Sequence, residues 1–230
     1  MKNILLALVA CSMMLSSCQY FEAQEDTLNV QSTEVPEIKF PSILVNGDNP
    51  AFITVGETYE DAGAMATLGA EDISDDMEVV SDVDASAVGV YSVTYSVEST
   101  NALGQSSAAT ATRFVAVRHA VGPGPTLAGN YTSTSTSFGG ASFGQTMTVT
   151  DNGNGYYSAT DVYAHPNADQ PANFFDLGNA EVVIEPRSTA QTIFGLAMIG
   201  TVTVDPGVTL GMNITFPAIG FSTVKPWDKQ

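Results

Sequence analysis

Few side chains in this 230-residue sequence are suited to acid–base or nucleophilic chemistry. It holds two histidines, His119 and His165, and two cysteines, Cys11 and Cys18. His119 begins a Pro/Gly-rich stretch and His165 directly precedes a proline, so neither is expected on a regular element that would orient its ring. A catalytic site centred on histidine is therefore not predicted.

Carboxylate pairs are a second route to catalysis, because two acids can hydrolyse a glycosidic bond. Eight acids follow residue 126, and Glu181 and Glu185 would share one face of a strand. Four residues of strand separate them by roughly 13 Å, whereas glycosidase pairs lie about 5–10 Å apart. Other pairings stay open, but the protein is not expected to be an enzyme.

Aspartates crowd one part of the N-terminal half, and their hard oxygens would suit calcium. Their spacing fits no EF-hand loop, and neither does that of residues 151–155. The alternative is a solvated acidic face, so calcium binding is left open and no metal or cofactor is predicted. The aspartates are Asp72, Asp75, Asp76, Asp82 and Asp84.

Twelve aromatic residues follow residue 126. Neighbours on a strand point to opposite faces, so one ring of the Tyr156/Tyr157 pair must face outward unless both faces are covered. Exposed rings are platforms on which sugars stack, and nearby amides bind hydroxyls; the alternative is that the rings fill a core. The candidate ligand-binding residues are Tyr157, Tyr163, Phe175 and Trp227, with Asn154, Asn167 and Asn173 as polar partners.

The N-terminus combines several features of an export signal. Lys2 is followed by an apolar run over residues 4–15, which is shorter than the ~20 residues of a membrane-spanning helix but fits a signal peptide. Leu15-Ser16-Ser17-Cys18 resembles the lipobox of bacterial lipoproteins, which implies removal of residues 1–17 and acylation of Cys18. The acidic cluster just past Cys18, residues 19–26, resembles the surface-export signal of Bacteroidetes lipoproteins. The alternative is a solvated tether, and residues 18–36 as a whole are expected to be an acidic tether. Together they imply an outer-membrane lipoprotein that faces the cell exterior.

The net charge excludes several partners. Without Lys2, the mature chain carries 6 basic and 25 acidic residues, a net charge of −19. Such a surface repels nucleic acid and anionic membranes, so the lipid would be the link to the membrane. With Cys11 removed and Cys18 acylated, no disulfide is available, and stability must come from apolar burial.

Residues 37–118 show the period-2 alternation of β-strands. The clearest case is 90–97, where Tyr and Val alternate with Ser and Thr, and 111–117 is the expected last strand. Short strands separated by turns, such as the turn at 47–50, predict a β-sandwich.

The same region resembles the bacterial immunoglobulin-like domain family DUF5011. Its pattern G-x-x-Y-x-D-x-G-A is present as Gly56, Tyr59, Asp61, Gly63 and Ala64. The resemblance implies an immunoglobulin-like sandwich. Tyr91 opens its strand in the position of the tyrosine corner of that fold.

A Pro/Gly linker, residues 119–126, leads to a second β-rich region, residues 127–230. Strand-like segments flank the Asn/Gly-rich turn at 151–155, which predicts a hairpin. The pieces GNYTSTST, DNGNGYYSATDVY and KPW resemble the DUF5012 type of Bacteroides lipoprotein domain. That resemblance implies a place beside outer-membrane glycan-uptake proteins, with no settled activity.

These observations predict an all-β protein, in which an immunoglobulin-like β-sandwich precedes a second antiparallel sandwich or barrel-like domain. The expected function is non-catalytic binding or uptake of an oligosaccharide or polysaccharide, with outer-membrane transport proteins as candidate partners and the first domain as a spacer. A structural or adhesive protein that contacts other proteins is the alternative, and a glycoside-active enzyme is third. A glycan binder should show exposed rings beside amides in one groove, whereas an adhesive protein should show an apolar patch or an open edge strand.

Lipidation at Cys18 is the first testable prediction. Intact-mass analysis of the membrane fraction should find a diacylated or triacylated cysteine at the N-terminus, because the lipobox-like segment directs processing at that residue. Cys18→Ala should leave the chain without acyl mass. A wild-type chain with an unmodified N-terminus would contradict the prediction.

Overall fold

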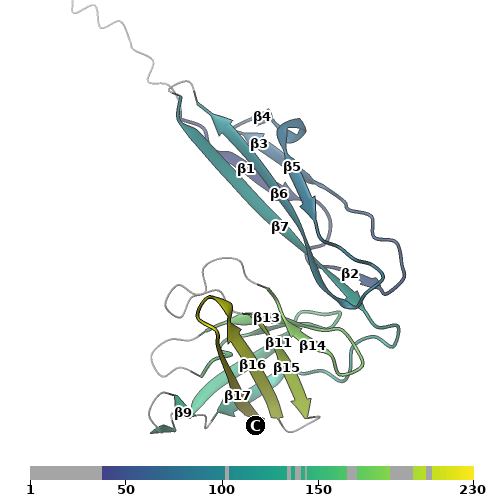
Figure 1. Cartoon of the computed structure of the whole chain (residues 1–230), viewed down its shortest axis with the longest axis vertical. Helices are drawn as coiled ribbons and strands as arrows, with labels where there is room; N and C mark the ends of the chain where they lie inside the picture. The colour runs from purple at the N-terminus through teal and green to yellow at the C-terminus, as the bar shows by residue number, and fades with distance from the viewer. Residues whose placement is uncertain are drawn as a thin grey trace, which may run out of the picture. The chain divides into compact units, whose positions relative to one another are not determined.

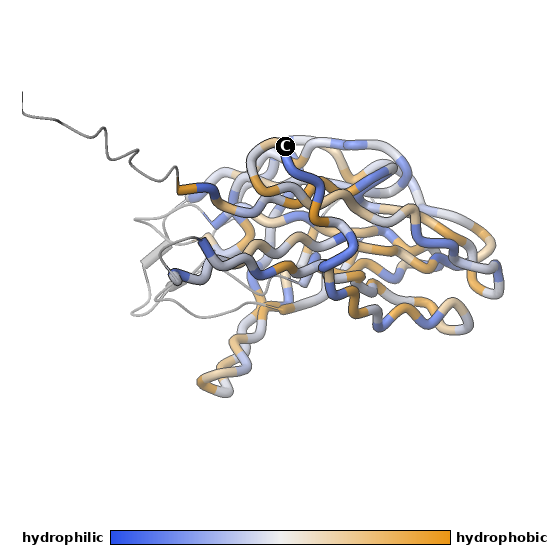
Figure 2. The backbone as a smooth tube through the Cα atoms, turned by 90° about the horizontal axis from the view of Figure 1, so that it is seen from above, coloured by the Kyte–Doolittle hydropathy of each residue, from blue (hydrophilic) through white to orange (hydrophobic). Residues whose placement is uncertain are grey.

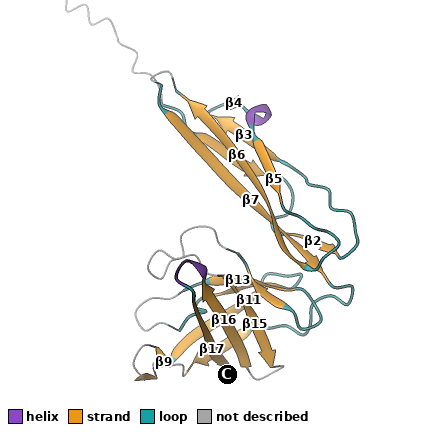
Figure 3. Ribbon diagram, in the orientation of Figure 1, coloured by secondary structure: helices purple, strands orange, loops and turns teal. Residues whose placement is uncertain are grey.

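The computed structural model describes residues 38–101, 104–133, 136–137, 141–142, 144–164, 170–186, 199–205 and 209–230. These residues form seventeen strands and two single-turn 3-10 helices, so the fold is all-β, as the sequence predicts (Figures 1 and 3). None of the helices within these ranges is long and apolar enough to span a membrane. The signal peptide, Cys18 and the tether lie outside the described residues.

Two sheets make up an N-terminal sandwich. The smaller sheet has the order β1-β3-β4, and the larger one has the order β2-β7-β6-β5, with β2 parallel to β7 and all other pairs antiparallel. A 3-10 turn, Ser74–Asp76, joins β4 to β5. The strands are β1 (Pro41–Val45), β2 (Ala51–Thr54), β3 (Ala64–Leu68), β4 (Glu71–Asp72), β5 (Glu78–Ser81), β6 (Gly89–Thr100) and β7 (Ser106–Arg118).

The sandwich core follows from the alternation of β6. Val93, Tyr95 and Val97 are each at most 2% exposed, while the Ser and Thr residues between them are half-buried. They point toward the smaller sheet, whose Ile43 packs against this cluster. The Tyr91 hydroxyl donates to the carbonyl oxygen of Ala87 at 3.0 Å, which is the bond expected of a tyrosine corner.

The G-x-x-Y-x-D-x-G-A segment meets β7 at a buried ion pair. The guanidinium of Arg113, which is 1% exposed, pairs with the carboxylate of Asp61. It also donates to the carbonyl oxygens of Asn46 and Gly63. One cation therefore joins the larger sheet to the loops that flank β1 and β3.

Two tyrosines complete this network. The hydroxyl of Tyr95 donates to Asp61 at 2.8 Å, and that of Tyr59 donates to the same carboxylate at 3.0 Å. Burial, with the bond to Asp61, raises the pKa of Tyr95 above its ordinary value. A tyrosine hydroxyl is protonated at neutral pH even at its ordinary pKa, and the raised pKa lets Tyr95 remain a donor at more alkaline pH.

The C-terminal part is a closed antiparallel barrel of eight strands. Its order is β8-β11-β12-β13-β14-β15-β16-β17, and β17 pairs back to β8. β9 (Thr136–Ser137) and β10 (Ala141–Ser142) pair separately, and a 3-10 turn, Pro217–Ile219, joins β16 to β17. The barrel strands are β8 (Gly129–Ser133), β11 (Gln145–Asp151), β12 (Tyr156–Ala159), β13 (Ala172–Asp176), β14 (Val182–Ile184), β15 (Ile199–Asp205), β16 (Thr209–Phe216) and β17 (Phe221–Lys229).

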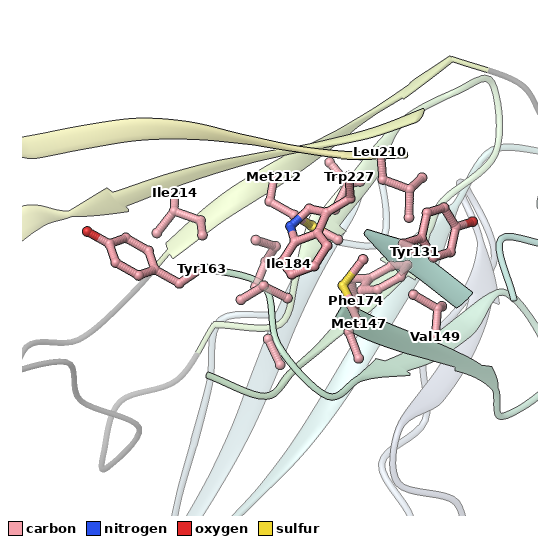
Figure 4. Packing of buried hydrophobic residues seen from close by; sticks show 14 of the residues in the cluster. Tyr131, Met147, Val149, Tyr163, Phe174, Ile184, Leu210, Met212, Ile214 and Trp227 are labelled. Carbon is pink, nitrogen blue, oxygen red and sulfur yellow. The ribbon is translucent and has the colours of Figure 1, made fainter. Parts of the chain in front are cut away.

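Alternation again decides which side chains fill the barrel. Apolar and polar residues alternate along the strands (Figure 2), and in β16 every second residue, from Leu210 to Phe216, is buried. Trp227 lies opposite Leu210 across β16 and β17 and is fully buried (Figure 4). The hairpin predicted around residues 151–155 is confirmed, because β11 pairs with β12 there.

Breaking the buried ion pair should unfold the sandwich more easily. Asp61→Ala removes the anion but leaves Arg113 buried, and such an uncompensated charge costs about 3–5 kcal/mol. Urea unfolding measures the loss. Asp76→Ala, at an exposed position of the 3-10 turn, is the matched control and should change stability by less than about 0.5 kcal/mol. Equal stabilities for the two variants would contradict the assigned role of Asp61.

Candidate functional site

The four rings expected to form a sugar platform are buried. Tyr157 is 2% exposed and Tyr163 is 3% exposed, while Phe175 and Trp227 are fully buried. Three of them, all but Phe175, belong to the barrel core. A sugar cannot stack on rings that other side chains already cover, so the prediction of exposed rings is wrong at these four positions.

Both faces of β13 are covered, which explains why adjacent aromatic residues do not leave one ring outside. Phe174 points into the barrel and stacks on Tyr157 with ring centroids 5.3 Å apart. Phe175 belongs to a separate cluster, where it contacts Tyr156 at 4.8 Å and Phe52 at 6.2 Å between centroids. Sequence alternation identified two faces but could not show that each is packed.

The predicted amide partners are not gathered around one site. Asn154 is exposed, has a positive φ of 55° in the β11–β12 turn, and accepts a bond from Arg118 through its carbonyl oxygen at 3.0 Å. Asn173 is half-buried and its side-chain amide donates to Glu185 at 3.3 Å. Asn167 lies outside the described residues. Asn154 and Asn173 thus have structural contacts of their own.

The residues weighed for catalysis are also bound to neighbours. The His119 ring lies 3.0 Å from the Glu181 carboxylate, and Glu185, 7% exposed, accepts a bond from the Tyr156 hydroxyl at 2.6 Å. His165 lies outside the described residues. Residues 140–144 are Gly-Ala-Ser-Phe-Gly, which fits the Gly-x-Ser-x-Gly pattern of a serine nucleophile. That pattern requires the serine on a strand-to-helix turn, whereas Ser142 lies in a two-residue strand.

Aspartates of the acidic cluster serve as local turn caps. Asp72 accepts bonds from the backbone N–H and hydroxyl of Ser74, and these bonds lower the pKa of Asp72. Asp84 does the same with Ser86. Among the described residues no group of three or more histidine, cysteine or acidic side chains is arranged to hold a metal.

One cation lies inside the barrel. Lys225 is 4% exposed, and its ammonium lies 4.8 Å from the centre of the Tyr163 ring. Burial lowers the pKa of Lys225, while the charge of Asp161 acts in the opposite direction. The carboxylate of Asp161 in turn accepts bonds from the backbone N–H groups of Tyr163 and Gln170 at 3.0 and 3.2 Å. These bonds fix the conformation of the loop that begins at Asp161.

A small apolar pocket lies where the linker crosses one end of the barrel. Leu127, Val182 and Val204 line it, and the carboxylate of Asp176 holds its wall by accepting the N–H groups of Gly124 and Gly178 at 2.8 and 2.9 Å. Its volume is about 140 Å³, well below the roughly 300 Å³ at which ligand pockets begin. This pocket therefore fits a structural role.

A larger groove runs along the outer barrel wall and has a volume of about 450 Å³. We call it the barrel-wall groove. The amide of Asn213 donates to the hydroxyl of Thr203, just outside the groove, at 2.8 Å. Its lining combines polar and apolar residues: Thr201, Asn213 and Thr215, with Val183, Ile184, Pro186, Ile199 and Gly200.

Gly200 lines this groove where β15 pairs with β16. A Cβ there would lie 2.1 Å from the carbonyl oxygen of Asn213 and 3.1 Å from Cδ1 of Ile184. Only glycine allows β15 to approach β16 this closely. The sequence pattern does not reveal a groove, although the alternation of Thr201 and Thr203 with valine indicates an outward polar face on this strand.

The sandwich matches a known family. Residues 43–117 match the family described as bacterial surface protein, Ig-like domain. The sandwich is an Ig-like domain. The match covers one third of the chain, and the finer assignments to DUF5011 and DUF5012 stay predictions.

Two solved structures resemble the chain at low identity. A lipoprotein from Bacteroides thetaiotaomicron is 21% identical, with a TM-score of 0.33, and the match covers 83% of this chain and 100% of that one. The M60 catalytic domain with the CBM51-1 and CBM51-2 domains from Clostridium perfringens ZmpB is 13% identical, with a TM-score of 0.27. That match covers 75% of this chain and 15% of the other. No curated protein matches the sequence.

The buried position of Trp227 can be measured directly, because it is the single tryptophan of the sequence. Compared with the unfolded chain, its fluorescence emission should be blue-shifted and less strongly quenched by acrylamide, since the barrel core excludes water. Trp227→Ala should destabilise the barrel by about 3–5 kcal/mol, whereas the control Phe221→Ala, at a position 36% exposed, should cost far less. Emission like that of the unfolded chain would restore the exposed-platform prediction.

Proposed function

We propose that this chain is a non-catalytic, lipid-anchored accessory protein of the cell surface that acts by contacting other proteins. The observation that carries the proposal is the distribution of apolar side chains. The Ig-like domain leaves Leu44, Met65, Val79 and Val80 of its strands exposed, whereas the barrel buries most of its large rings and exposes Ile199, Ile219 and Val224.

The exposed residues occur on two parts of the Ig-like domain. Leu44 and Met65 face each other across β1 and β3 and are 62% and 41% exposed. Val79 and Val80 of β5 are 51% and 57% exposed. Exposed apolar surface and open strand edges are features by which β-domains bind other chains. They are also the features expected of an adhesive protein.

The surface location is supported by two independent features. The lipobox-like segment ending at Cys18 would anchor the chain, and residues 43–117 match a domain family of bacterial surface proteins. In this proposal the anchor is in the outer membrane and the protein faces the exterior. The Ig-like domain then both separates the barrel from the anchor and offers a contact surface.

Glycan binding is the second candidate function, and the barrel-wall groove favours it. The groove combines hydroxyl and amide groups with Ile199 and Pro186, a mixture that suits a neutral sugar. No aromatic side chain of the described residues lines it, so among these residues a sugar would meet hydrogen-bonding and aliphatic groups. An oligosaccharide would then bind the barrel and not the Ig-like domain.

Site-specific photo-crosslinking on intact cells separates the two candidates. With a photoreactive residue at Leu44, we expect adducts with a defined surface protein, because that side chain lies on an open apolar face. The same residue at Thr201, in the groove, should give none. A glycan array probed with the full mature chain should likewise show no hit that Asn213→Ala abolishes.

The opposite pattern would overturn the proposal. Adducts absent at Leu44, together with a glycan signal lost in Asn213→Ala, would assign the function to the groove. Phe221→Ala, outside the groove residues, is the control for the array and should leave any glycan signal unchanged.

A further inference from the structure

The strand β5 is an open edge of the larger sheet of the Ig-like domain. It pairs with β6 on one side and ends the larger sheet on the other. All four of its residues are exposed, whereas every residue of β2, the strand at the opposite edge, is half-buried. An exposed edge presents backbone N–H and C=O groups to which another strand can add.

The part of the sequence that contains this edge is acidic. Between residues 40 and 112 the sequence holds 12 acidic residues and no lysine or arginine. Asp75 and Asp76 lie just before β5, separated from it by Met77, Glu78 begins the strand and Asp82 follows it, and these four acidic residues are exposed. A second copy of this chain would be repelled at such an edge, while a cationic segment would be attracted.

We propose that β5 binds an extended, cationic peptide segment of a partner protein by strand addition. The inference rests on the proposed function, because it names the chemistry of one protein partner. Backbone hydrogen bonds along the edge supply affinity, and side chains on alternate sides supply selectivity. The acidic residues at both ends select lysine and arginine over acidic residues.

The register of β5 says how such a segment would be read. Val79 lies opposite Tyr95 and therefore points to the inner face of the sheet, while Val80 lies opposite Thr94 and points to the outer face. A bound strand would meet one exposed valine on each face. A segment that alternates apolar and basic residues would pack apolar side chains on the valines and pair its basic side chains with the acidic residues at the ends of β5.

The test uses the full mature lipoprotein in detergent and a fluorescent peptide of about eight alternating Lys and Val residues, long enough to span β5. Anisotropy should show binding that weakens between about 50 mM and about 500 mM salt. Hydrogen exchange should slow at the amides of 78–81. A peptide N-methylated at alternate residues cannot complete the backbone bonds and should not bind.

Variants at exposed positions localise the site. Val79→Lys with Val80→Lys should weaken binding about tenfold or more, and Asp75→Lys with Asp76→Lys should weaken it without altering the strand. Val224→Lys is the matched control, because Val224 is 59% exposed on the barrel, and it should leave binding unchanged.

The inference is overturned if the Lys–Val peptide does not bind, if the N-methylated peptide binds equally well, or if protection falls outside β5. The proposed function has its own test, since crosslinking from Leu44 does not involve β5. Leu44 adducts without peptide binding would refute the strand-addition inference alone. Loss of both results would refute the proposed function as well.

Discussion

The buried guanidinium of Arg113 is the constraint on which the Ig-like domain depends. A cation inside a sandwich is costly unless it is paired and fully hydrogen-bonded. Here Asp61 supplies the charge, and the carbonyl oxygens of Asn46 and Gly63 take further bonds. The Nε of Arg113 has no partner among the described residues, but the bonds of its two terminal nitrogens place the loop after β1 and the loop before β3 against the larger sheet.

That constraint gives a physical meaning to the G-x-x-Y-x-D-x-G-A pattern. The aspartate of the pattern, Asp61, is the anion of the network. The tyrosine of the pattern, Tyr59, donates a hydrogen bond to it, and so does Tyr95 of β6. The network ties the centre of the larger sheet to the smaller one but does not reach β5. The edge strand β5 pairs with β6 on one side and ends the larger sheet on the other.

The barrel solves a different problem. An eight-stranded barrel has an interior about wide enough for its own side chains, and here Trp227, Met212 and Phe174 are among those that fill it (Figure 4). These buried rings supply apolar burial that stabilises the barrel, and because other side chains cover them they cannot serve as stacking platforms. Binding is left to outer surfaces, where threonine and asparagine alternate with the buried residues.

The sequence by itself determined the all-β class, the strand face shared by Val93, Tyr95 and Val97, the hairpin around residues 151–155 and the corner role of Tyr91. Each follows from local rules, because strand period and turn chemistry act over a few residues. Only the tertiary structure decided whether a face is covered. Phe174 and Phe175 are adjacent and both buried, while Val79 and Val80 are adjacent and both exposed. In both pairs the strand period predicts one buried and one exposed side chain. The difference comes from what packs on each face of the sheet, which depends on residues far away in the chain.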